Sequence, residues 1–197
     1  MTLTQEQVLD LAFKQARTHH VWQKKAVEDD LLHRLYDVFK MGPTSVNSCP
    51  GRFVFLKSLE EKEKLKPALS PGNVEQTMTA PVTMIMAYDT RFYEHLDRLY
   101  PAFPAKTFFE GPEKEAHAEK SAFQNATLQH AYLIIAARLL GLDAGPMAGF
   151  DGGMVDAIFF NGDTWKTALL CNLGYGDASK LYPRGPRSAF QEVCKIL

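Results

Sequence analysis

The sequence lacks the long apolar runs and cysteine spacings that mark membrane proteins, disulfide-rich secreted proteins and zinc sites. No stretch of the 197 residues approaches the roughly 18 consecutive apolar residues of a membrane span, and the first residues show no basic region followed by an apolar core. Its three cysteines, Cys49, Cys171 and Cys194, have neither CxxC spacing nor an even count. We therefore expect a cytoplasmic protein with free thiols.

An excess of charge of one sign is also lacking. Lysine and arginine number 22 and aspartate and glutamate 23, which gives a formal net charge of -1 and a pI near 6.6. This balance gives no basis for binding nucleic acid or an anionic membrane surface. With 46% hydrophobic residues, the length suits one domain over residues 1–197.

The familiar motifs of phosphate binding and hydrolysis are missing too. The chain contains neither GxGxxG after a strand nor GxxxxGK[ST], so a Rossmann site and a P-loop are not indicated. HExxH and GxSxG do not occur either. His19 and His20 are adjacent, so their side chains diverge on any regular element, and we expect no metal site.

Hydrophobic periodicity predicts helices and strands without regular βαβ alternation, which favours an α+β fold. The long helix within residues 119–146 has apolar neighbours on most sides, so we expect it to be buried. Residues 90–120, rich in aromatics but broken by prolines, should form short helices and loops that cover a cleft. Helices are predicted within residues 4–16, 27–43, 58–69, 119–146 and 188–197, and strands within 52–58, 80–89 and 165–177.

Several details of these elements can be checked. Thr4 with Gln7, and Ser58 with Glu61, have the spacing of helix capping boxes. The nearly continuous apolar run 80–89 predicts a strand buried on both faces. The expected buried positions are Leu31, Leu35, Val38 and Phe39 in one helix and Leu128, Tyr132, Ile135, Ala136 and Leu139 in the long one.

Five polar segments remain between these elements. Separately each has an ordinary explanation as a turn or a solvated surface. Together they offer Arg17, Arg184 and Arg187 for a phosphate, and backbone donors and short amides for a planar polar heterocycle. The segments are "ARTHH" (16–20), "GPTSVNSCP" (42–50), "PGNVEQ" (71–76), "GPMAGFD" (145–151) and "YPRGPR" (182–187).

In this order the segments resemble the nitroreductase family of FMN enzymes. "KMGPTSVNSCPGRFVFL", "LSPGNVEQTMTAPVT" and "GYGDASKLYPRGPR" resemble most closely the branch that contains the malonic semialdehyde reductase of the Rut pyrimidine-degradation pathway. The resemblance covers essentially the whole chain. It implies an antiparallel sheet wrapped by helices, in an intertwined homodimer that binds two FMN molecules at its interface.

The resemblance also implies site residues. Residues 43–47 would meet the flavin ring, commonly that of the partner subunit. Asn73 and Gln76 would lie at the pyrimidine edge of the ring, and the 145–150 segment near flavin N5. The expected cofactor-binding residues are Arg17, Thr18, His19, Pro43, Thr44, Ser45, Asn47, Asn73, Gln76, Pro146, Met147, Ala148, Gly149, Arg184 and Arg187.

Two positions depart from the family pattern. Well-studied nitroreductases have a lysine where this sequence has Gln76, and another basic residue near the position of Val21. Both would place positive charge beside flavin N1 and O2. Without them we expect a less electron-accepting flavin, which favours the Rut-like branch over the broad-substrate nitroreductases.

We expect an enzyme that works by ping-pong turnover, with NADPH or NADH as electron donor and malonic semialdehyde reduced to 3-hydroxypropionate. No catalytic side chain is required, since flavin N5 would carry the hydride. Two alternatives stay open: a broad-specificity nitroreductase or quinone reductase, and a non-catalytic FMN-binding module. For the substrate carboxylate the candidates are Arg91, Arg98 and Lys106, each of which could equally be solvated surface charge. Phe123 is the favoured aromatic lining of the site, with core packing as its alternative.

Overall fold

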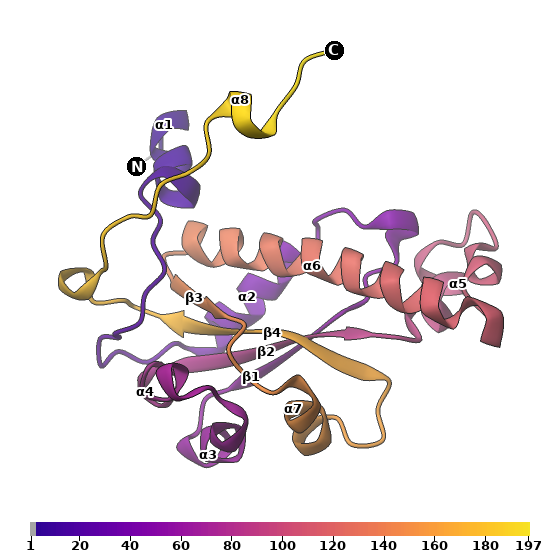
Figure 1. Cartoon of the computed structure of the whole chain (residues 1–197), viewed down its shortest axis with the longest axis horizontal. Helices are drawn as coiled ribbons and strands as arrows, with labels where there is room; N and C mark the ends of the chain where they lie inside the picture. Colours follow the sequence, from indigo (N-terminus) through magenta and orange to yellow (C-terminus); the bar gives the residue numbers. More distant parts are fainter. Residues whose placement is uncertain (1–2) are drawn as a thin grey trace.

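The computed structural model describes residues 3–197, in which helices cover both faces of a four-stranded antiparallel sheet (Figure 1). The strands lie in the order β1-β2-β4-β3. They are β1 (Gly51–Leu56), β2 (Val82–Asp89), β3 (Asp143–Met147) and β4 (Trp165–Gly174). The helices are α1 (Gln5–Leu9), α2 (Asp29–Phe39), α3 (Leu59–Leu65), α4 (Pro71–Thr79), α5 (Leu96–Leu99), α6 (Glu115–Leu139), α7 (Gly152–Phe159) and α8 (Phe190–Val193). This architecture confirms the α+β prediction.

The sheet separates two hydrophobic clusters. Helices α2 and α6 cover one face, while α3, α4 and α7 cover the other (Figure 1). Strand β2 serves both clusters, since Met84 and Met86 pack toward α2 and α6 whereas Ile85 and Ala87 pack toward the opposite layer. All eight residues of β2 are buried, which confirms the predicted strand buried on both faces.

The capping sequences correctly predicted where helices α1 and α3 begin. The Thr4 backbone N–H donates to Gln7 Oε1 at 2.8 Å, and the Gln7 N–H donates to Thr4 Oγ1 at 3.3 Å. These two bonds form the predicted capping box of α1, which continues as a π-helical turn over Asp10–Lys14. Ser58 Oγ likewise accepts from the Glu61 N–H at the start of α3.

The predicted buried faces of α2 and α6 need correction. Helix α2 buries Leu32 with Leu35 and Phe39, while Val38 is exposed. On α6 the residues against the sheet include Leu133 and Ala137. Leu128 and Leu139 are instead 46% and 41% exposed, because they lie on a side of α6 that none of the described elements covers.

Three elements were not predicted. Strand β3 occupies the end of the stretch 119–146 predicted as the long helix, which stops at Leu139 instead. Helices α4 and α7 lie in or beside segments predicted as turns, because each carries Gly or Pro near its start. The C-terminal helix was predicted over ten residues, but α8 has only four, and the tail around it projects from the body of the protein beyond α1 (Figure 1).

Residues 90–114 form short turns of helix around α5, but residues 115–120, predicted as part of the same irregular segment, already belong to the long helix α6. The short turns pack on the end of β2 and the first half of α6, with Phe92 and Phe109 in a third small cluster. The 3-10 turns of the chain are Ser45–Asn47, Lys66–Ala68, Phe92–His95, Ala105–Phe108, Pro112–Lys114 and Ala178–Lys180. Over residues 3–197, none of the helices has the length and apolarity to span a membrane.

Candidate functional site

Four guanidinium groups converge on one cavity of about 560 Å³ beside the start of the C-terminal tail. Arg17 donates from Nη2 to the Tyr182 carbonyl, and Arg184 donates from Nη2 to the Ala16 carbonyl at 3.0 Å. These reciprocal contacts tie residues 16–17 to the tail. The cavity is lined by Phe13, Lys14, Ala16, Arg17, Thr18, His20, Arg138, Tyr182, Pro183, Arg184, Gly185 and Arg187.

The guanidinium groups of this cavity are not paired with carboxylates of the described residues. Lys14 is paired with Glu6 at 2.8 Å, but no guanidinium of the cavity is within ion-pair distance of a carboxylate in the described part of the chain. Burial lowers the pKa of Arg138, whose Nη1 donates to a backbone carbonyl. Several guanidinium groups that face one cavity without a counter-charge fit a phosphate.

A line of hydrogen bonds leads from this cavity to the 145–150 segment. His20 lines the cavity, and its Nδ1 is 2.8 Å from Gln76 Oε1. Gln76 Nε2 donates to Asn73 Oδ1 at 2.6 Å, and Asn73 Nδ2 donates to the Gly149 carbonyl at 2.8 Å. Three of the predicted cofactor-binding residues, Asn73, Gln76 and Gly149, therefore lie in one connected group with the guanidinium cavity.

The surroundings of Gly149 leave no room for a larger residue. A Cβ at this position would lie 2.7 Å from Asn73 Nδ2, which is closer than real contacts allow. Its neighbours Pro146 and Met147 end strand β3, where the Met147 side chain is buried and only Ala148 is exposed. Ala148 therefore offers a small, exposed residue to a ligand, while the partly buried Gly149 leaves room for Asn73 and Ser70 to pack against the backbone.

His19 does not line the cavity. Its ring is buried against Gly176, where a Cβ would lie 1.9 Å from His19 Nδ1, and its Nε2 is 3.4 Å from Asp143 Oδ1. Burial lowers the pKa of His19 and outweighs the opposing effect of Asp143. Of the two adjacent histidines, His20 lines the cavity and His19 does not.

The remaining predicted cofactor residues lie elsewhere, in the loop between α2 and β1. The Ser45 N–H donates to Asn125 Oδ1 at 2.7 Å, and Asn47 Nδ2 donates to the Leu99 carbonyl at 2.8 Å. Thr44 Oγ1 accepts from the Cys49 N–H. The loop is therefore fixed between α6 and α5.

The chain does not bring its two groups of predicted residues together. Asn125 holds the loop, while Arg138 lines the guanidinium cavity. Thirteen positions of α6 separate these two residues, which corresponds to about 20 Å along the helix axis. In Figure 1 the loop between α2 and β1 lies toward the α5 end of α6, while α1 and the C-terminal tail lie toward the other end.

The candidate substrate cations differ in their surroundings. Arg91 is paired with Glu94, and Lys106 is paired with Glu110 at 3.2 Å. Arg98 makes no ion pair with the described residues and lines a cavity of about 660 Å³. Pro43, Asn47 and His95 are among the other residues of this cavity, so of the three candidates Arg98 is the one beside the loop.

Phe123 is exposed on α6 and makes an edge contact with Tyr88, with ring centroids 5.6 Å apart. The pKa of Tyr88 is raised to about 12, chiefly by burial and then by its hydrogen bond to Glu119. An exposed phenylalanine beside a neutral tyrosine could line an apolar binding surface.

Sequence analysis missed His20 and Arg138. His20 was considered only as half of a metal pair, and the structure shows no group of three or more possible metal ligands among residues 3–197. Arg138 carried a usable signal, since it is the one charged residue in the otherwise apolar stretch "LIIAARLLGL" at the end of the long helix. A cation in such a position often has a specific anionic partner or ligand.

The chain matches the family model described as "Nitroreductase family" over residues 14–175. A protein of Burkholderia lata, provisionally named as an NADH dehydrogenase/NAD(P)H nitroreductase, is 55% identical over 196 residues and covers 100% of both chains. A protein of Ralstonia nicotianae with the same provisional name is 51% identical over 197 residues, again with 100% of both chains.

Solved structures share the fold. A nitroreductase from Exiguobacterium sibiricum, crystallised in complex with FMN, superposes with a TM-score of 0.83 at 18% identity and covers 100% of both chains. An enone reductase of gut-bacterial fatty acid saturation metabolism superposes with a TM-score of 0.82 at 18% identity, over 99% of this chain and 100% of that one.

Proposed function

The chain belongs to the nitroreductase family, and from that premise we propose that it is an FMN-dependent NAD(P)H oxidoreductase. The observation that carries the proposal is the guanidinium cavity with its hydrogen-bonded line from His20 to Gly149. The cavity suits the phosphate of FMN, and the amides of Asn73 and Gln76 suit the polar edge of its ring. When bound, FMN would take a hydride from NAD(P)H and pass it to a second substrate.

The side chains around this site would bind and orient the cofactor. Arg17 and Arg184 would hold the phosphate, while the tie between residues 16–17 and the tail keeps both groups in place. Gln76 is held from both sides by His20 and Asn73, so its orientation is fixed before a ligand arrives. Neither Gln76 nor Val21 supplies positive charge there, as the sequence indicated.

We further propose that the flavin site is completed by a second copy of the chain. Residues 43–47 lie about 20 Å along α6 from the guanidinium cavity, so they would serve the cofactor of the partner subunit. The uncovered side of α6 carries Leu128, Ala131, Ile135 and Leu139 at helical spacing, which is typical of a helix that packs on a partner.

The C-terminal tail supports the same homodimer. Its apolar residues Phe190, Val193, Ile196 and Leu197 are all exposed in the single chain. A protruding tail with this composition would gain stability by wrapping around a second subunit, as in an intertwined dimer.

For the second substrate we propose a small aldehyde that carries a carboxylate, such as malonic semialdehyde, which would be reduced to 3-hydroxypropionate. Arg98 is the best placed of the three candidate cations, because it has no carboxylate partner among the described residues and lines the cavity beside Asn47. A guanidinium can bind a carboxylate with two parallel hydrogen bonds. Phe123 would cover the apolar part of the substrate.

A broader nitroreductase or quinone reductase is the second candidate. It is favoured by the names of the Burkholderia and Ralstonia relatives, which refer to NAD(P)H nitroreductase. The two candidates differ in whether the substrate needs a charged partner. A quinone or a neutral nitroaromatic has no carboxylate for Arg98 to bind.

Steady-state kinetics with two classes of acceptor tests this choice. We expect Arg98→Gln to lower kcat/KM for malonic semialdehyde by about 10- to 100-fold, the loss of one charge-assisted contact, and to leave menadione turnover unchanged. Lys106→Gln, which removes a cation already paired with Glu110, is the matched control. Equal loss with both acceptors, or a wild-type preference for the neutral acceptor, would favour the broad reductase.

A further inference from the structure

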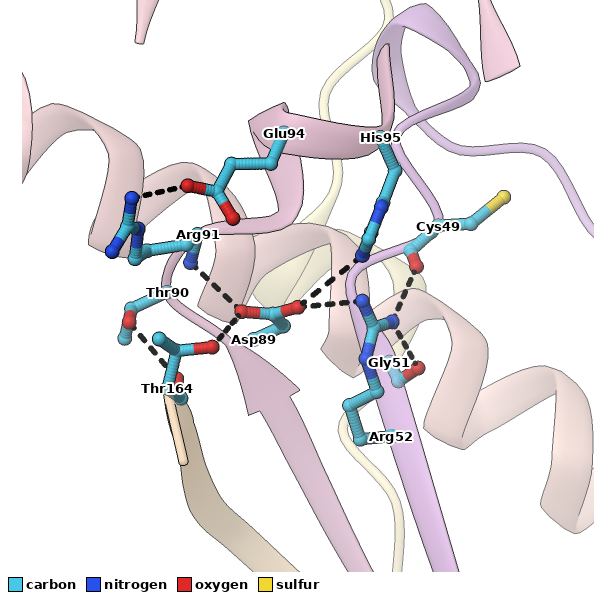
Figure 2. Close-up of polar contacts among 9 residues, drawn as sticks. All are labelled: Cys49, Gly51, Arg52, Asp89, Thr90, Arg91, Glu94, His95 and Thr164. Carbon is cyan, nitrogen blue, oxygen red and sulfur yellow. Dashed lines mark hydrogen bonds and ion pairs between the residues drawn. The ribbon is translucent and has the colours of Figure 1, made fainter. Parts of the chain in front are cut away.

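We propose that the ion pair between the partly buried Arg52 and the buried Asp89 is a positioning device that holds residues 44–49 in a binding conformation. The pair lies at the junction of the loop with strand β1, and its contacts are drawn in Figure 2. This inference rests on the proposed function, in which the loop meets the flavin of the partner subunit. It adds two residues that lie outside the predicted contact set.

The loop has an unfavourable backbone. Val46, Asn47 and Cys49 have φ values of 48°, 49° and 42°, although none of them is glycine. The left-handed region is unfavourable for an L-residue, and a β-branched valine is especially disfavoured there. Three such residues within four positions persist only where the surroundings hold them, and such strain is concentrated at ligand-binding segments.

Arg52 and Asp89 bind three consecutive carbonyl groups at the end of this loop. Arg52 Nη1 donates to the carbonyls of Cys49 at 3.1 Å and Gly51 at 3.0 Å. The carbonyl between them, that of Pro50, accepts from the Asp89 backbone N–H at 2.9 Å. The pair therefore fixes the direction of the chain directly after the strained residues.

Asp89 is itself immobilised on all sides, as Figure 2 shows. Its Oδ2 accepts from Arg52 Nη2 at 2.6 Å, and its Oδ1 accepts from the Arg91 N–H at 2.9 Å and from Thr164 Oγ1 at 2.6 Å. His95 Nε2 is 4.0 Å from Oδ2. With 4% exposure, Asp89 is a fixed point that joins β1, β2 and β4.

The geometry assigns the pair a role beyond charge compensation. A buried ion pair is by itself weak evidence for stability, because desolvation offsets much of the attraction between its members. Here the guanidinium uses one nitrogen for the carboxylate and the other for the loop. A lysine could keep the contact with the Asp89 carboxylate but not also the contact with the loop, since its single ammonium lacks the planar, forked geometry of a guanidinium.

The test is Arg52→Lys, compared with Arg91→Lys as a matched control. Arg91 belongs to the same network, but its guanidinium is paired with Glu94 on the surface, at 56% and 43% side-chain exposure. Two readouts are needed. One is the rate of amide hydrogen exchange in residues 44–50, and the other is the dissociation constant for FMN measured by fluorescence quenching.

We expect Arg52→Lys to speed exchange in the loop by tenfold or more and to weaken FMN binding about tenfold, the value of one hydrogen bond. Arg91→Lys should change neither. Asp89→Asn, which keeps the size of the side chain, should produce the same two effects, and the double variant should be no worse than the worse single one.

The outcomes separate this inference from the proposed function. Unchanged exchange and unchanged FMN affinity in Arg52→Lys would overturn the positioning role. Faster exchange with unchanged FMN affinity would also overturn it, because the pair would then hold the loop in a conformation that FMN binding does not need. If the wild-type protein bound no FMN at all, the proposed function would fall, while the exchange comparison would still decide whether the pair holds the loop.

Discussion

Replacing Arg184 with glutamine should separate recognition of the cofactor's phosphate from recognition of its ring. Arg184 lines the guanidinium cavity, and among residues 3–197 its guanidinium hydrogen-bonds to the Ala16 carbonyl. A glutamine amide can still donate to that carbonyl, so Arg184→Gln removes the positive charge and leaves the tie between the tail and residue 16 within reach.

The expected loss of FMN affinity follows from the strength of one hydrogen bond between charged groups. A hydrogen bond between charged groups contributes about 1.5–3 kcal/mol, and 1.4 kcal/mol corresponds to a tenfold change in affinity. Because Arg184 is exposed and Arg17, Arg138 and Arg187 remain in the cavity, we expect the lower part of this range. The dissociation constant for FMN should rise about 10- to 30-fold.

The assay is a pair of titrations with FMN and with riboflavin, which has the same ring and no phosphate. Arg184→Gln should weaken FMN binding and leave riboflavin binding within about twofold. Lys14→Gln is the matched control, because Lys14 lines the same cavity but is neutralised by Glu6 at 2.8 Å. Equal weakening of both ligands would mean that Arg184 supports the fold of the site, and no weakening of FMN would refute the assignment of the cavity to phosphate.

Three further predictions test the packing, the dimer and the close approach at the site. Burial without a carboxylate partner lowers the pKa of Lys62 to about 8, so wild-type stability should rise with pH between about 8 and 10.5, where the unfolded chain keeps a proton that the folded chain has lost. At pH 7 the free energy of unfolding of Lys62→Met should therefore exceed that of the wild type by up to about 3 kcal/mol. Urea unfolding should show that this difference disappears above pH 10.5. Leu128→Glu places a charge on the uncovered side of α6, and light scattering should then report a monomer with weakened FMN binding; a dimer like that of the wild type would exclude this side as the interface. Gly149→Ala should weaken FMN binding at least tenfold because its Cβ would press on Asn73 Nδ2, whereas Gly72→Ala, whose Cβ meets nothing within 4 Å, should not; equal affinities in a titration would contradict the close approach.

Local signals accounted for much of the fold. The capping boxes, the Gly-Pro end of α2 and the uniformly apolar strand β2 each depend on neighbouring residues, so the sequence predicted them correctly. The exposed leucines of α6 were misassigned because hydrophobic spacing shows that a face is apolar but not what covers it. In this family the cover is proposed to be a second chain.

The site was only partly predictable for similar reasons. Thr18 pairs with Ala144 and Trp22 with Gly176 through isolated bridges, so the chain between them runs along the sheet edge and points neighbouring side chains in opposite directions. This geometry buries His19 and leaves His20 at the cavity, a choice that the dipeptide alone does not reveal. The Arg52–Asp89 pair joins positions 37 residues apart and depends on the register of β1 with β2, which periodicity cannot supply.

The central claim is that the guanidinium cavity and its hydrogen-bonded line form the flavin site of an oxidoreductase. The most direct test is the visible absorbance of the purified protein, before and after anaerobic addition of NADPH and then malonic semialdehyde. The account predicts flavin bands that bleach with NADPH and return with the aldehyde. Bands that never bleach would indicate a flavin-binding module without reductase activity, and a colourless protein that takes up no added FMN would contradict the account.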